Sequence, residues 1–167
     1  MKGQSEVIVF VLLFLIGVTL FLSSVIWSQG IFNRNSDMAK LNNVENFMVN
    51  LDNKIQNIVK LGGQDSIDYG IQATIQLTSP NTIEIQSPLT VKIPADWVVI
   101  PSKYSNITEK LDGNLLRLRL QYPTDSYAIY LYTDGPTLAT PQKVYIEKVS
   151  TYTQNNIEYI KVKITFK

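Results

Sequence analysis

The 167-residue sequence contains no cysteine and no histidine. The first absence excludes disulfides and thiolate nucleophiles, the second excludes an imidazole general base, and together they remove the commonest zinc ligands. Serine and threonine therefore have no histidine to activate them, and no glycine-rich phosphate loop follows a predicted strand. The adjacent pair Ser102 and Lys103 is typical of an ordinary loop. We expect a protein that is not an enzyme and that uses no cofactor.

Charge is also scarce and nearly balanced. Only 17% of the residues are charged, and 15 Lys and Arg against 14 Asp and Glu leave a net charge of +1. No stretch gathers Lys or Arg, so the sequence does not indicate a polyanionic partner. We therefore expect no binding to nucleic acid. The length has room for one folded domain in addition to an N-terminal segment.

The N-terminal segment is strongly apolar. From Val7 to Trp27 the chain runs 21 residues without a charge, and a helix of that length rises roughly 30 Å, the thickness of a bilayer core. Three interpretations are open: a one-pass membrane anchor, a secretory signal removed by a cut near residues 28–30, and an apolar helix that is retained after processing. The second is disfavoured because the h-region of such a signal usually has only about 7 to 15 residues.

The residues in front of the apolar run favour the third interpretation. Lys2, Gly3, Gln4 and Glu6 stand directly before it. This arrangement resembles the class III signal peptides of archaeal type IV pilin-like proteins, a family of pilins and archaellum-related subunits. The resemblance implies that a prepilin peptidase cuts between Gly3 and Gln4 and so removes residues 1–3. It also implies that the retained helix then leaves the membrane and packs with copies of itself in the core of a filament.

Glu6 is the only acidic residue before Asp37. In the family that the sequence resembles, the acidic residue usually stands fifth in the mature chain, whereas Glu6 would stand third. We expect an assembly role in which the Glu6 carboxylate pairs with the new amino group of Gln4 in a neighbouring subunit. That amino group is largely cationic at neutral pH and would be costly to bury without a counter-charge. The alternative is that Glu6 marks the membrane boundary or favours the positive end of the helix dipole.

A polar patch at residues 29–37 follows the apolar run and contains residues typical of helix caps, so we expect the helix to bend or restart there. Within residues 33–63, apolar side chains recur at spacings of three and four, which predicts an amphipathic helix that packs on the following domain. The positions of this apolar face are Leu41, Val44, Phe47, Met48, Leu51, Ile55, Ile58 and Val59. Gly62 and Gly63 supply a natural stop.

Beyond the two glycines the period changes from helical to two. This alternation predicts about seven strands, at residues 67–77, 83–85, 89–93, 116–122, 127–132, 143–149 and 160–166. Turns are expected at 79–81 and 112–114. The fold class is therefore α+β: an apolar helix over 4–32 continues into the amphipathic helix of 33–63, and an antiparallel β-sandwich head occupies 64–167.

Two features of the head bear on its surroundings. The triplet at 106–108 is the only Asn-x-Ser/Thr motif, and we expect it in a loop, where Asn106 is a candidate for N-glycosylation in an exported protein.

Tyr127, Tyr130 and Tyr132 share one predicted strand. They are either an aromatic patch for a partner or tyrosines in their ordinary strand positions, and the second reading is the more common one.

These features predict a structural subunit of an archaeal type IV pilus-like surface filament that acts in adhesion, attachment or aggregation. Such a subunit would lie in the cell membrane before assembly and in an extracellular filament afterwards. The alternative is a membrane-anchored extracellular β domain that binds the surface layer, like an archaellum stator component. Lys2 on one side of the apolar run, against Arg34 and Lys40 on the other, leaves the positive-inside rule undecided. The expected orientation therefore rests on the resemblance.

Overall fold

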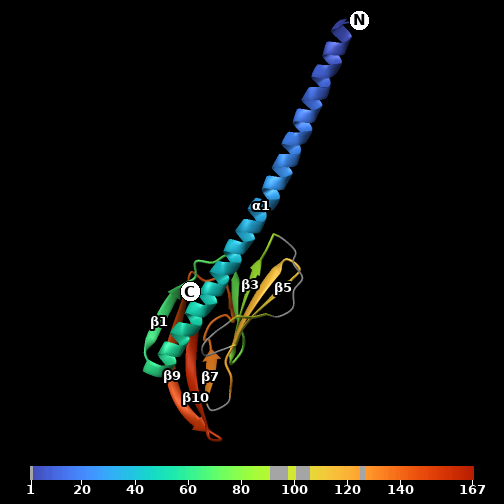
Figure 1. The fold of residues 1–167 in the computed structure, drawn as a ribbon. Coiled ribbons are helices and arrows are strands. Elements are labelled where there is room, and N and C mark those ends of the chain that lie inside the picture. Colours follow the sequence, from blue (N-terminus) through green and yellow to red (C-terminus); the bar gives the residue numbers. More distant parts are fainter. Residues whose placement is uncertain (1, 91–97, 101–105, 125–126) are drawn as a thin grey trace.

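In the computed structural model, which describes residues 2–90, 98–100, 106–124 and 127–167, a long helix carries a β-rich head at its C-terminal end (Figure 1). Side chains of residues 2–6 and of Val98 are outside this description. The helix α1 (Lys2–Leu61) has 60 residues, which makes it about 90 Å long at 1.5 Å per residue. Its N-terminal half projects away from the head. The predicted α+β class and the order of helix before sheets are confirmed.

The helix does not bend or restart at residues 29–37, so that prediction is wrong. The segment contains no proline, and the single Gly30 costs only about 1 kcal/mol in a helix interior. Asp37, predicted as a cap, instead contacts the head. Its Oδ2 accepts a hydrogen bond from the backbone N–H of Thr90 at 2.8 Å, and Lys40 Nζ lies 3.9 Å from its Oδ1. The polar patch thus marks where the helix meets the head.

The helix ends where the two glycines predict. Gly62 and Gly63 have φ values of +77° and +89°, and the N–H of Gly62 donates to the carbonyl of Ile58 at 2.8 Å. Glycine enters this left-handed region without the steric cost of a Cβ, so it closes the last turn and redirects the chain.

Ten strands among the described residues form two sheets. The four-stranded sheet has the order β1-β9-β10-β7 and consists of β1 (Gln64–Asp68), β7 (Tyr127–Tyr132), β9 (Lys143–Gln154) and β10 (Ile157–Phe166). The six-stranded sheet has the order β4-β5-β6-β3-β2-β8 and consists of β2 (Thr74–Ser79), β3 (Thr82–Pro88), β4 (Val98–Ile100), β5 (Asn106–Asp112), β6 (Leu115–Gln121) and β8 (Leu138–Ala139). Among these strands only β7 and β10 pair in parallel.

The strand count therefore exceeds the predicted seven. The strand predicted at 67–77 is divided, because the chain leaves the four-stranded sheet after Asp68 and enters the six-stranded sheet at Thr74. Strands β4, β5 and β8 were not predicted; β4 and β8 have three and two residues, too few for an alternation to be visible. The strand predicted at 89–93 begins just after β3, and most of it lies outside the described residues.

One hydrophobic core joins the helix to both sheets. The predicted apolar face of α1 is buried from Val44 to Val59, and Leu41 packs at its edge. These side chains form one cluster with residues of the six-stranded sheet, such as Ile85 and Leu118, and of the four-stranded sheet, such as Ile146. The predicted packing of this helix against the following domain is confirmed. Because α1 shares the core and one strand pair is parallel, the head only approximates the predicted antiparallel sandwich.

Candidate functional site

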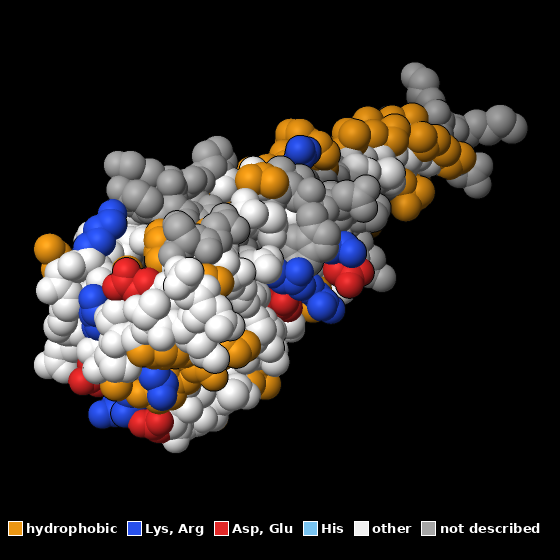
Figure 2. Space-filling model, turned by 90° about the horizontal axis from the view of Figure 1, so that it is seen from below, with side chains coloured by type: hydrophobic (Ala, Val, Ile, Leu, Met, Phe, Trp, Pro, Cys, Tyr) orange, Lys and Arg blue, Asp and Glu red, His pale blue; other side chains and the backbone are white. Residues whose placement is uncertain are grey.

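The N-terminal half of α1 exposes apolar side chains on every side. We call residues 7–32 the stem, and every side chain in it is exposed within the chain; Phe10 and Trp27, for example, are each 72% exposed. In the space-filling view hydrophobic side chains are prominent along the stem, which recedes behind the head, whereas the head shows scattered charges among polar groups and smaller hydrophobic patches (Figure 2). By length and composition this helix can cross a membrane. The stem is therefore the surface that most needs an apolar environment.

Three of the four hydroxyl groups of the stem are hydrogen-bonded within the helix. Thr19, Ser23 and Ser24 each donate a hydrogen bond to the carbonyl four residues earlier, at 2.8, 2.9 and 2.9 Å. A hydroxyl that bonds in this way presents no unpaired donor to lipid or to another helix. Gly17 has open space where a Cβ would lie, and small residues of this kind let apolar helices approach closely.

The structure places the predicted processing and assembly residues at the free end of the stem. Lys2, Gly3, Gln4 and Glu6 all lie within the first two turns of α1, at the end farthest from the head (Figure 1). Asn106 lies on the head, so the structure does not bring it together with them. The cleavage after Gly3 and the pairing role of Glu6 remain predictions.

The glycosylation triplet begins a strand, which corrects the predicted loop. Asn106 is the first residue of β5 and pairs with Gln121 of β6. Its own side chain is exposed, while the next residue, Ile107, is fully buried. The Asn106 side chain is thus accessible to a modifying enzyme, and its glycosylation remains a prediction.

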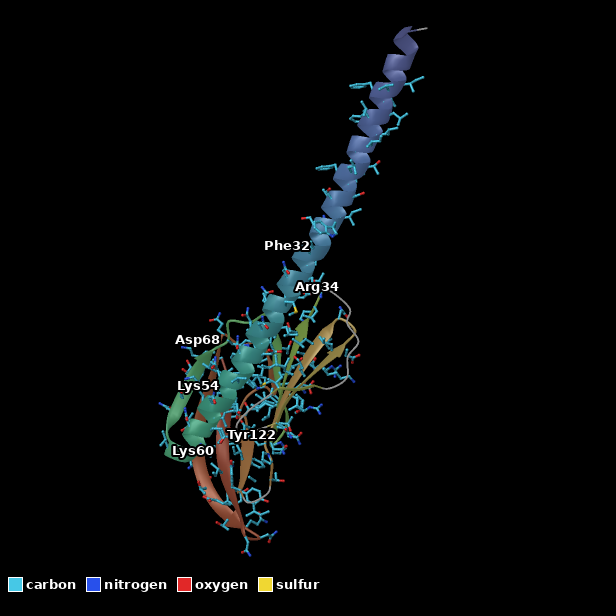
Figure 3. All side chains as sticks on the ribbon, in the orientation of Figure 1. Phe32, Arg34, Lys54, Lys60, Asp68 and Tyr122 are labelled. Carbon is cyan, nitrogen blue, oxygen red and sulfur yellow. The ribbon has the colours of Figure 1, made fainter. Side chains whose placement is uncertain are left out.

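Polar contacts fix the C-terminal half of α1 in the head, below the junction marked by Phe32 and Arg34 (Figure 3). Tyr122 donates a hydrogen bond to Asp52 Oδ1 at 3.1 Å, and both side chains are buried. Burial, and after it the Asp52 charge, raises the pKa of Tyr122 well above its usual value, so the phenol stays protonated and donates. Lys54 Nζ lies 2.6 Å from Asp65 Oδ2 on β1, and this contact lowers the pKa of Asp65. The helix therefore holds the stem in a defined direction relative to the head.

Two carboxyl groups meet where α1 faces the six-stranded sheet. Glu109 of β5 lies beside Glu45 of α1, and its Oε2 is buried without a hydrogen-bond partner among the described residues. Burial first, and then the neighbouring Glu45 carboxyl, together raise the pKa of Glu109 from its usual 4.5 to about 7. This contact between helix and sheet therefore changes its charge near neutral pH.

The three tyrosines of one predicted strand do not form a single patch. In the register between β7 and β10, Tyr130 lies opposite Lys161 and Tyr132 opposite Lys163, on the outer side of the sheet. Tyr127 is on the other face, together with the buried Ile129. The residues that lie beside Tyr130 and Tyr132 on this outer side belong to β9 and β10. Their proximity follows from the strand order and is not visible in the sequence.

In the part of the chain that the structure describes, no group of three or more acidic side chains could hold a metal ion. Comparisons with protein-family models, curated proteins and solved structures found no match. The assignment of a function therefore depends on the stem, the motif at its free end and the surface of the head.

Proposed function

We propose that this chain is a structural subunit of an archaeal type IV pilus-like surface filament that serves adhesion, attachment or aggregation. The stem carries the proposal, because it exposes apolar side chains on all sides while the same helix continues into a well-packed core. At about 25 cal/mol per Å² of apolar area, leaving a helix of this length in water would cost tens of kcal/mol. The stem therefore needs either lipid or other apolar helices around it.

Two further observations support a stem that moves from lipid into a bundle of helices. Three of its four hydroxyls are already hydrogen-bonded within the helix, so these donors are paired in either environment. Lys2, Gly3 and Gln4 stand where a prepilin peptidase would cut, and Glu6 is then the counter-charge available to the amino group of Gln4. The β head would form the filament surface.

The alternative is a membrane-anchored extracellular β domain that binds the surface layer, like an archaellum stator component. The length of the stem supports it, since 26 residues rise about 39 Å and span a bilayer with some tilt. Both proposals need the same signal and the same helix. They differ in whether the stem leaves the membrane.

The test combines N-terminal sequencing of the mature protein with shearing of filaments from the cell surface. We expect a mature start at Gln4 and the chain in the sheared fraction; a start at Gln4 with the chain only in membranes would favour the anchor. Gly3→Val should block processing because a branched side chain does not fit a site that selects glycine. Gly17→Val, for which the structure shows open space, is the matched control and should be processed normally. A mature start at Ile31 would overturn both proposals.

A further inference from the structure

The outer face of the four-stranded sheet gathers tyrosines from three strands. The register places Tyr130 and Tyr132 of β7 beside alternate residues of β10, and it places Tyr159 of β10 opposite Tyr152 of β9. The rings of Tyr152 and Tyr159 are stacked, with centroids 5.1 Å apart and an angle of 9° between their planes. Tyr145 of β9 lies on the same face and is 41% exposed. We call this outer surface the tyrosine face.

The rest of the tyrosine face is mostly polar. Within residues 64–68, 130–132, 143–147 and 159–167, the outward positions carry tyrosine or else Gln, Ser, Thr, Asp, Glu and Lys, and the exposed aliphatic side chain of β9 is Val149, between Tyr145 and Tyr152. Protein-binding surfaces are usually anchored by a desolvated apolar centre. Tyrosine rings separated by hydrogen-bonding groups suit a ligand that is itself both flat and polar.

Charge on this face is close to balance. Lys143 Nζ lies 3.1 Å from Asp68 Oδ1, and Lys163 pairs with Asp134. Two other lysines lie over tyrosine rings: Lys161 Nζ is 4.5 Å from the centroid of Tyr132, and Lys167 Nζ is 5.2 Å from that of Tyr145. These cation–π contacts hold the long side chains beside the rings. A ligand recognised mainly by negative charge does not fit such a surface.

A hollow of about 350 Å³ lies in this face, where β1, β9 and β10 run side by side. The side chains around it include Gln64, Ser66, Tyr145, Glu147, Lys163 and Thr165. They supply one aromatic ring with its phenol hydroxyl, one amide, two aliphatic hydroxyls, a carboxylate and an ammonium group. A sugar ring has the complementary chemistry, because its C–H face can stack on an aromatic ring while its hydroxyls both donate and accept hydrogen bonds.

We infer that the tyrosine face binds a polysaccharide, with one sugar ring in the hollow against Tyr145 and neighbouring rings on the other tyrosines. The inference deepens the proposed function, since it rests on a head that faces the outside and it names the surface that such a head would attach to. It does not depend on whether the stem is packed in a filament or remains in lipid.

The test is calorimetric titration of the full chain in lipid nanodiscs with three neutral hexasaccharides, those of glucose, N-acetylglucosamine and mannose. We expect saturable binding of at least one, with about a tenfold loss of affinity in Tyr145→Ala, the size of effect that one lost ring contact produces. Tyr130→Ala should also weaken binding. Tyr127→Ala is the matched control, because it removes a tyrosine of the same strand and the same exposure from the opposite face.

Three results would overturn the inference. The first is the absence of binding to all three hexasaccharides, and the second is an equal loss of affinity in the Tyr127→Ala control. The third is self-association of the nanodiscs that Tyr130→Ala abolishes, because the face would then bind a second copy of the chain. The filament proposal and the polysaccharide inference can also fail separately. A chain that starts at Gln4 and enters filaments but binds no sugar refutes only the polysaccharide inference. A chain that starts at Met1 and binds sugar refutes only the filament proposal.

Discussion

The partial burial of Glu109, with Glu45 beside it, makes the stability of the head depend on pH. The pKa of Glu109 is about 7 in the folded protein and 4.5 when the group is unperturbed. Between these values the folded state binds more protons than the unfolded state, so the free energy of unfolding falls as pH rises. The stabilisation from this group is complete below about pH 4.5 and lost above about pH 7.

The size of the effect follows from the pKa difference. A shift from 4.5 to about 7 corresponds to roughly 3 kcal/mol at 1.36 kcal/mol per pH unit, which is an upper limit. Glu109 is only partly buried, and solvent screening reduces such energies. We therefore expect a loss of about 1 to 2 kcal/mol between pH 4.5 and pH 8.

The variant Glu109→Gln keeps the size of the side chain and removes the titration. We expect it to be more stable than the wild type by about 1 to 2 kcal/mol at pH 8 and equal to it near pH 4.5. The assay is denaturant unfolding of the full chain in detergent micelles, followed by near-ultraviolet circular dichroism across this pH range. Glu147→Gln, at an exposed position on the other sheet, is the control and should change stability by less than about 0.5 kcal/mol. A difference between Glu109→Gln and wild type that stays constant with pH would refute the reasoning.

Three further predictions concern the core and the stem. Leu51→Ala should lower the free energy of unfolding by about 2 to 5 kcal/mol, because Leu51 is fully buried between helix and sheets; a cost below 1 kcal/mol in denaturant unfolding would contradict this packing. Gln56→Leu should raise the melting temperature, since the buried Gln56 amide has no hydrogen-bond partner among the described residues and such a group costs about 1 to 3 kcal/mol. A lower melting temperature would show that this amide is satisfied. Glu6→Gln should leave processing intact but make filaments scarce by electron microscopy, whereas normal filament yield with a start at Gln4 would leave Glu6 as a boundary marker.

Local regularities of the chain were sufficient to predict the helix and its buried face. Apolar residues at spacings of three and four fall on one side of any α-helix, so Met48, Leu51 and Ile55 had to lie together whatever they packed against. Gly62 and Gly63 were predictable as a stop because no other residue enters the left-handed region so readily. The polar patch at 29–37 misled the prediction, since cap residues indicate a helix end only when their side chains bond to their own helix, and Asp37 bonds to the head.

Only the tertiary structure decided which strands are neighbours. The alternation along 67–77 indicates that each part of this segment is half-buried. A strand that stays in one sheet and a segment that crosses from one sheet to the other show the same alternation. The approach of Glu45 to Glu109 and the tyrosine face both bring together residues far apart in the chain. Such contacts follow from strand order and register. Both are determined by the packing of the whole core, so no local sequence pattern predicts these contacts.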